Sequence, residues 1–79
     1  MLVTRRPRYP MPEYFRKALL YYGLMEAYRA RPPYQRNDYI GWIKNAKRPA
    51  TKQKRLEQMI KELQSGKRYM KMPYSPTNQ

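Results

Sequence analysis

The chain has 79 residues, and its 18 Lys and Arg against 5 Asp and Glu give a formal net charge of +13 at pH 7. Because it contains no cysteine and no histidine, disulfides, thiolate zinc sites and catalytic triads that depend on an imidazole are excluded. The charge exceeds the roughly 2 to 8 units that keep a small domain soluble, so we expect an anionic partner, either nucleic acid or an acidic protein surface. A surface charged only for solubility is the alternative.

Residues 1–11 form a predicted basic, proline-rich arm. Pro7 and Pro10 lack an amide hydrogen and fix φ, so neither a helix nor a central strand continues through this segment. The arm has no apolar run of the roughly 7 to 15 residues that a secretory signal needs. No segment of the chain approaches the roughly 20 apolar residues of a membrane span. We therefore expect a cytoplasmic protein without a membrane span.

A first helix is predicted to begin at about Glu13, directly after Pro12. Proline fits the first turn of a helix, and an acidic side chain there complements the positive end of the helix dipole. The following apolar side chains have the spacing of one buried helical stripe. They are Phe15, Ala18, Leu19 and Tyr22. Gly23 disfavours a continuous helix, so we expect a kink or a break there.

Two further helices are predicted, over Gln35 to Lys47 and from Pro49 to about Ser65. Each has four apolar residues at the spacing of a buried stripe. These residues are Tyr39, Trp42, Ile43 and Ala46 in the second helix, and Leu56, Met59, Ile60 and Leu63 in the third. Gly41 indicates close packing against the second helix, and Gly66 supplies the left-handed residue that ends the third.

These patterns predict a small all-α domain of three helices over residues 12–67. No strand is expected. Residues 68–79 form an aromatic and basic tail, which we expect to pack back onto the helices through Tyr69 and Met72.

The connection between the second and third helices carries six cations within twelve residues and no acid, which we call the basic junction. Its residues are Lys44, Lys47, Arg48, Lys52, Lys54 and Arg55. A helix that begins at about Pro49 adds unpaired backbone N–H groups beside these cations, so the junction is a predicted anion-binding site. The alternative interpretation is structural: Arg48 and Arg55 would pair with Asp38, Glu57 or Glu62 and join the two helices.

Nucleic acid would be bound with little sequence preference. The exposed side of the third helix offers mostly cations of the kind that contact phosphates, which predicts a steep dependence on salt and only a weak likeness to a helix-turn-helix. Aromatic residues interleaved with cations are also able to stack on single-stranded bases. Tyr9, Tyr69 and Tyr74 are the candidates for stacking, because the aromatics of the helical stripes are expected in the core.

Catalysis is not expected. The five acids are dispersed along the chain, so neither a paired-carboxylate site nor an oxygen-ligand metal site is indicated, and Glu57 with Lys61 has the spacing of an ordinary helical ion pair. We therefore expect no cofactor, no metal and no small-molecule substrate. The sequence does not indicate an oligomeric state.

A series of residues from Pro12 to Lys67 points to a known family. Its first part is Pro12, Ala18, Leu19, Pro32, Pro33 and Arg36. Its second part is Tyr39, Trp42, Ile43, Ala46, Lys47, Arg48, Pro49, Thr51, Arg55, Leu56, Leu63, Gly66 and Lys67. This series resembles the helical module of the bacteriocin-protection family, also described as YdeI or OmpD-associated (OmdA-like), with Lys52 where the family usually has Arg.

The resemblance implies a bacterial protein, and the family name implies protection against antimicrobial peptides or stress. A domain of charge +13 repels a cationic peptide rather than sequestering it. Many members carry an additional α/β domain ahead of this module, and its functions are not implied for these residues. The leading hypothesis is a non-enzymatic binding module whose basic junction engages an anionic partner. The alternative is a structural or accessory domain that contributes an exposed aromatic patch to a protein complex.

Overall fold

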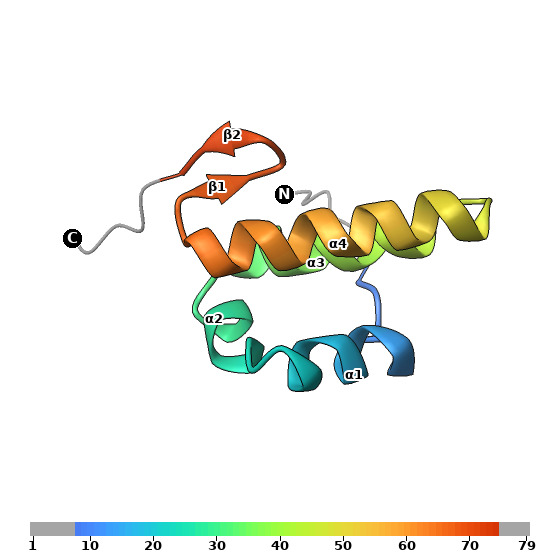
Figure 1. Cartoon of the computed structure of the whole chain (residues 1–79), viewed down its shortest axis with the longest axis horizontal. Helices are drawn as coiled ribbons and strands as arrows, with labels where there is room; N and C mark the ends of the chain where they lie inside the picture. Colours follow the sequence, from blue (N-terminus) through green and yellow to red (C-terminus); the bar gives the residue numbers. More distant parts are fainter. Residues whose placement is uncertain (1–7, 75–79) are drawn as a thin grey trace, which may run out of the picture.

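The computed structural model describes residues 8–74. The elements are α1 (Glu13–Tyr21), α2 (Met25–Arg29), α3 (Pro33–Lys44), α4 (Pro49–Ser65), β1 (Arg68–Tyr69) and β2 (Met72–Pro73). Helices α3 and α4 run in opposite directions, α1 and α2 lie on one side of α4, and the antiparallel hairpin of β1 and β2 lies on the other (Figure 1). Expectations for residues 1–7 and 75–79 fall outside the described residues.

The expected helical domain is confirmed in outline, but the number of helices is not three. The break predicted at Gly23 separates α1 from α2, so residues 8–74 contain four helices. Gly23 has a φ of +67°, which glycine adopts at little cost, and the Leu24 N–H then donates to the Leu19 carbonyl at 2.8 Å. The chain turns there and begins a new helix at Met25.

The second predicted helix is α3, and it ends three residues earlier than expected. It begins at Pro33, because a proline in the first turn already has the helical φ. It ends at Lys44 and could not have continued through Arg48, which precedes a proline and is held in extended backbone with φ −101° and ψ 141°. The third predicted helix is confirmed as α4, which ends at Ser65 where Gly66 has a φ of 72°.

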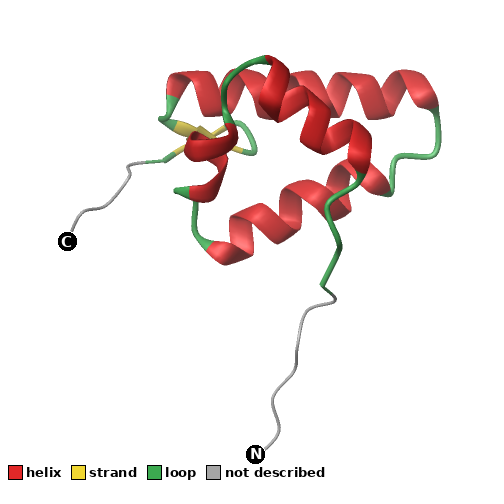
Figure 2. Cartoon of the chain, turned by 90° about the horizontal axis from the view of Figure 1, so that it is seen from below, coloured by secondary structure: helices red, strands yellow, loops and turns green. Residues whose placement is uncertain are grey.

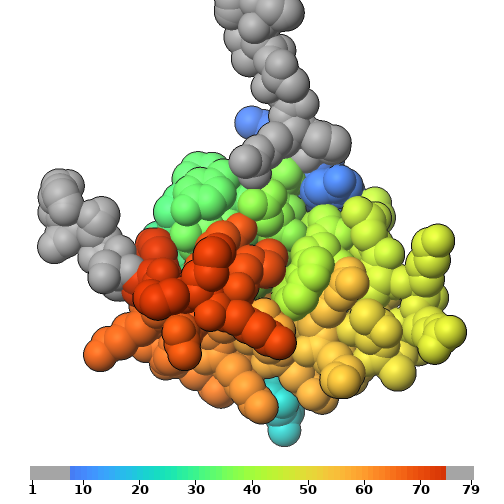
Figure 3. Space-filling view, turned by 90° about the horizontal axis from the view of Figure 1, so that it is seen from above, coloured from blue at the N-terminus to red at the C-terminus, as the bar shows by residue number. Residues whose placement is uncertain are grey.

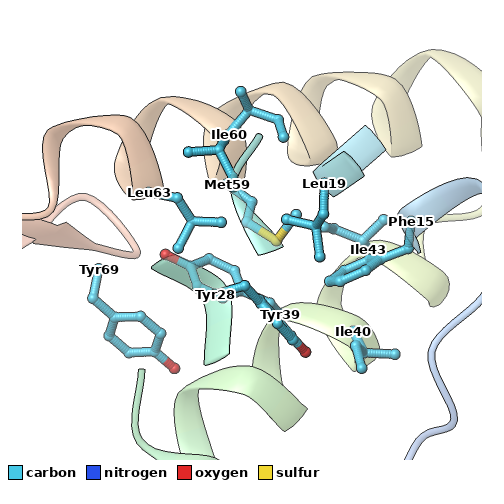
Figure 4. Packing of buried hydrophobic residues seen from close by; sticks show 11 residues of the cluster. Phe15, Leu19, Tyr28, Tyr39, Ile40, Ile43, Met59, Ile60, Leu63 and Tyr69 are labelled. Atoms are coloured by element: carbon cyan, nitrogen blue, oxygen red, sulfur yellow. The ribbon is translucent and has the colours of Figure 1, made fainter. Parts of the chain in front are cut away.

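The core lies between α1, α3 and α4, and Figure 4 shows its side chains converging from these helices. Its members are Phe15, Leu19, Leu24, Tyr28, Tyr39, Ile40, Ile43, Met59, Ile60, Leu63 and Tyr69. The prediction that Tyr22 is buried is wrong, because α1 ends at Tyr21 and leaves the Tyr22 side chain 51% exposed. Trp42 and Leu56, expected in the core, are only half-buried.

A short hairpin replaces the strand-free tail that the sequence predicts. Its turn consists of Met70 and Lys71, whose φ values of 51° and 67° are those of a tight two-residue hairpin turn. Tyr69 packs back as expected, because it is buried and its hydroxyl donates to Asp38 Oδ2 at 2.8 Å. Met72 does not, since its side chain is 53% exposed.

The arm, as far as the structure describes it, lies against α3 (Figure 2). The Tyr9 N–H donates to Asn37 Oδ1 at 3.0 Å, and the Tyr9 ring lies over Gly41. A Cβ on residue 41 would be 2.5 Å from Tyr9 Cε2, so only glycine allows this approach. The close packing predicted from Gly41 is confirmed, and the partner is the arm.

Gly41→Ala is expected to release the arm while leaving the helices intact. Alanine adds roughly 1 kcal/mol of helix propensity, but its methyl group displaces the Tyr9 ring. Trypsin should therefore cleave the Arg8–Tyr9 bond faster in this variant than in the parent, with no fall in the melting temperature. Asn45→Ala, at the exposed end of the same helix, should leave the cleavage rate unchanged. An equal rate in both variants would show that Tyr9 is not held at Gly41.

Candidate functional site

The basic junction lies at one end of the molecule, where α3 ends and α4 begins (Figure 3). Four of its cations are exposed: Lys44, Lys47, Arg48 and Lys54. The other two, Lys52 and Arg55, are partly buried. Arg48 is the N-cap residue of α4, so its side chain extends from the same helix end whose first amides lack helical partners.

Arg55 joins α4 to α3 without any carboxylate. Its Nη1 donates to the Trp42 carbonyl oxygen at 2.6 Å, and its guanidinium carbon lies 5.3 Å from the centre of the Trp42 ring. Because that carbonyl belongs to the last turn of α3, the positive guanidinium also complements the negative end of the helix dipole. The contacts of Arg55 therefore stabilise the packing of α4 on α3.

Among the described residues, no ion pair joins Arg48 or Arg55 to Asp38, Glu57 or Glu62. Asp38 accepts the Tyr69 hydroxyl, Glu57 accepts Gln53 Nε2 at 3.1 Å, and Glu62 lies in the interior. The helical pair expected between Glu57 and Lys61 is likewise absent from the described residues.

Two lysines of the junction lie over aromatic rings. Lys44 Nζ is 5.6 Å from the centre of the Tyr9 ring, and Lys52 Nζ is 5.3 Å from that of Tyr14, whose side chain is 38% exposed. Such contacts contribute only about 0.5–1 kcal/mol at exposed positions, so they orient the lysines without neutralising them.

A groove runs along residues 33–40 of α3 and was not anticipated from the sequence. We call it the α3 groove. Its volume is about 820 Å³, and its lining residues are Arg8, Tyr9, Tyr28, Pro33, Tyr34, Arg36, Asn37 and Ile40. The arm forms one wall of the groove, which is why helical periodicity, a property of single segments, did not reveal it.

A family comparison places the chain among known proteins. The family described as "Bacteriocin-protection, YdeI or OmpD-Associated" matches residues 8–66. The chain belongs to this family. No curated protein and no solved structure matches it significantly.

The matched region of this YdeI or OmpD-associated family member includes the arm from Arg8, α1 to α4 and the whole basic junction. The resemblance seen in the sequence is thereby confirmed. Within residues 8–74, no helix combines the length and the apolar character needed to cross a membrane.

The same module buries one carboxylate, on Glu62, whose side chain is only 5% exposed. Its Oε1 accepts the Tyr39 hydroxyl at 2.5 Å and the Met70 N–H at 2.9 Å. Its Oε2 accepts the Lys71 N–H at 2.7 Å and Gln58 Nε2 at 3.1 Å. Glu62 therefore holds the hairpin turn, in which two non-glycine residues have left-handed backbone at a cost of roughly 1–2 kcal/mol each.

Burial by itself raises the pKa of the Glu62 carboxyl. The hydrogen bonds from Tyr39, Lys71, Met70 and Gln58 outweigh it and leave that pKa below its ordinary value. The pKa of the Tyr39 hydroxyl is raised, first by burial and then by its hydrogen bond to the ionised Glu62. Glu62 is thus an ionised acceptor at neutral pH with a structural role.

Arg31 is the buried cation of the module, and its side chain is 5% exposed. Its Nη1 donates to Gln35 Oε1 and its Nη2 to the Glu62 carbonyl oxygen, both at 3.1 Å, and its guanidinium lies 4.6 Å from the centre of the Tyr74 ring. These bonds link the loop before α3 to the end of α4. The sequence does contain a sign of this buried polar cluster. Glu62 lies one turn after Met59 and next to Leu63, so its carboxylate falls on the apolar face of α4.

Proposed function

We propose that this family member is a non-enzymatic binding module whose basic junction engages an anionic partner, either nucleic acid or an acidic protein surface, with low sequence specificity. The observation that carries the proposal is the exposure of Lys44, Lys47, Arg48 and Lys54 at one end of the fold, with no described carboxylate paired to them. Four such charges around the turn that leads into a long helix favour phosphate or carboxylate groups.

The other charged side chains of the module support the proposal by contrast, because their contacts stabilise the fold. Arg31, Arg55 and Glu62 all have partners that serve the fold. Among the described residues, Lys47, Arg48 and Lys54 make no such contact and Lys44 contacts only the Tyr9 ring, while the mutual repulsion of these cations opposes folding. A partner that neutralises them gains free energy by releasing counterions.

Lys47→Ala with Arg48→Ala is expected to weaken binding to a duplex DNA, an RNA or polyglutamate at low salt. If all four exposed cations contact phosphates, the affinity for duplex DNA should fall with salt with a logarithmic slope of roughly −3.6, and the double variant should reduce that slope by about 2. Fluorescence anisotropy of a labelled ligand at several salt concentrations measures both quantities. Comparison of the three ligands distinguishes nucleic acid from an acidic protein surface.

The matched control is Lys17→Ala with Lys67→Ala, which removes the same charge from exposed positions outside the junction. It should leave the salt slope close to the parent value. An equal loss of affinity in both double variants would contradict a site at the junction, and so would the absence of binding to all three ligands at low salt.

An exposed aromatic patch favours a second candidate, an accessory domain within a protein complex. Leu20, Tyr21 and Tyr22 are 52%, 81% and 51% exposed, and Tyr22 lines a groove of about 380 Å³ between α1 and α4. Association that is insensitive to salt and is lost in Tyr21→Ser would favour this function over the first.

A further inference from the structure

The α3 groove combines aromatic rings with cations. Tyr9 and Tyr34 both line it, and the Tyr34 side chain, which packs edge-on against Tyr69, is 48% exposed. Arg8 and Arg36 also line the groove, and no acidic residue lines it among those described. A groove of this composition suits a ligand that carries both flat rings and negative charge.

The groove is continuous with the basic junction through Tyr9. The Tyr9 ring packs on Gly41, which follows the groove residue Ile40, and Lys44 lies over the same ring. From Tyr34 to Lys44, α3 rises roughly 15 Å. The surface therefore forms a short track along one helix, with tyrosines along its length and the exposed cations of the junction at its end.

Stacking of a base on Tyr9 competes with the contact that Lys44 now makes. A cation over an exposed ring changes an equilibrium by about two- to fivefold, whereas a base stacked on an aromatic ring changes it by about five- to 150-fold. Lys44 is exposed and has a flexible stem, so it is able to move from the ring to a neighbouring phosphate. The exchange favours the bound state.

We propose that the α3 groove binds single-stranded nucleic acid, with bases stacked on Tyr9 and Tyr34 and the phosphates directed to Arg8, Arg36 and the basic junction. This inference rests on the proposed function and narrows its partner class. Single strands are favoured over duplexes because paired bases are already stacked inside the helix and present no free face to a tyrosine. Stacking also predicts little sequence preference.

The test compares Tyr9→Ala with Tyr9→Phe. The full chain is titrated with labelled oligothymidylate, with a duplex of the same length and with polyglutamate. Tyr9→Ala should weaken binding of the single strand by about tenfold and leave the other two ligands unchanged, since only the single strand stacks on the ring. Tyr9→Phe retains a stacking ring and should bind the single strand within about twofold of the parent.

Tyr21→Ala is the matched control, because Tyr21 is 81% exposed on α1 and does not line the groove. Its affinity for the single strand should equal that of the parent. In a second measurement on the unaltered chain, photo-crosslinking to 5-iodouridine in the oligonucleotide should modify Tyr9 or Tyr34. Crosslinks confined to Tyr21 or Tyr22 would overturn the assignment.

The outcomes separate this inference from the proposed function. Equal affinity for single-stranded and duplex DNA, with Tyr9→Ala like the parent, overturns the groove as a stacking site and leaves the anionic partner of the junction in place. No binding to any of the three ligands overturns both. A third outcome concerns the junction alone. If the single strand still binds to the Lys47→Ala and Arg48→Ala double variant but not to Tyr9→Ala, the junction does not contact the phosphates.

Discussion

Glu62→Ala is expected to lower the free energy of unfolding by about 3–5 kcal/mol. The substitution leaves the buried Tyr39 hydroxyl and the partly buried Met70 and Lys71 amides without their acceptor. A fully buried unsatisfied donor costs roughly 1–3 kcal/mol, and partly buried ones cost less. It also removes the group that holds two residues in left-handed backbone. Small domains have total stabilities of about 5–15 kcal/mol, so this variant should be close to unfolding.

Urea unfolding followed by circular dichroism measures this effect. The matched control is Glu57→Ala on the same helix, because Glu57 is exposed and accepts only the Gln53 side chain. We expect the control to change stability by less than about 0.5 kcal/mol. Similar midpoints for the two variants would contradict the role given to Glu62.

The pH dependence of stability provides an independent check on Glu62. Its folded-state pKa lies below the ordinary value of 4.5, so its contribution is complete above that value and is lost as pH falls through the depressed pKa. Glu62→Gln carries no titrating group and should lose the part of the acid transition that Glu62 contributes. An unchanged acid transition in this variant would assign that transition to other carboxyl groups.

Arg31→Met is the second substitution with a large expected effect, a loss of about 2–4 kcal/mol. Methionine is similar in length and apolar, but it leaves Gln35 Oε1 without the Arg31 donor. It also removes one of three donors to the Glu62 carbonyl oxygen, which keeps the Gly66 N–H and the Ser65 hydroxyl. Gln35 is fully buried, so water does not replace the lost bond without opening the structure. Thermal unfolding should show a clear fall in the midpoint.

The control for Arg31 is Arg29→Met, the same substitution at an exposed position two residues earlier. It should leave the midpoint nearly unchanged. Adding Gln35→Leu to Arg31→Met removes both partners of the buried bond, and this double variant should be more stable than Arg31→Met alone. A double variant whose losses simply add would show that the two side chains are not coupled.

Local patterns predicted most of the helical fold. Pro49 and Gly66 bound α4 as expected, and the break at Gly23 was predicted from the conformational cost of glycine in a helix. Tyr22 fitted the apolar stripe but is exposed, because periodicity cannot show that the helix ends one residue earlier. The hairpin was missed because two-residue strands with a Met-Lys turn carry neither alternation nor the Asn or Gly that such turns favour.

The candidate site was predicted only as a set of cations. The sequence placed six of them around the turn between α3 and α4, and that position is confirmed. It did not separate Arg55, which bonds to the Trp42 carbonyl, from Lys47 and Arg48, which are exposed. The α3 groove was missed because its walls come from three separate segments, the arm, α2 and α3.

The sequence by itself determined the helical class, the helix ends set by proline and glycine, the position of the basic junction and the family. These depend on backbone geometry and on the spacing of residues within one segment. Only the tertiary structure decided which charges serve the fold, since burial and hydrogen-bond partners depend on contacts between distant segments. Glu62 and Arg31 are held inside by residues from other elements, while four cations of the junction remain exposed to solvent.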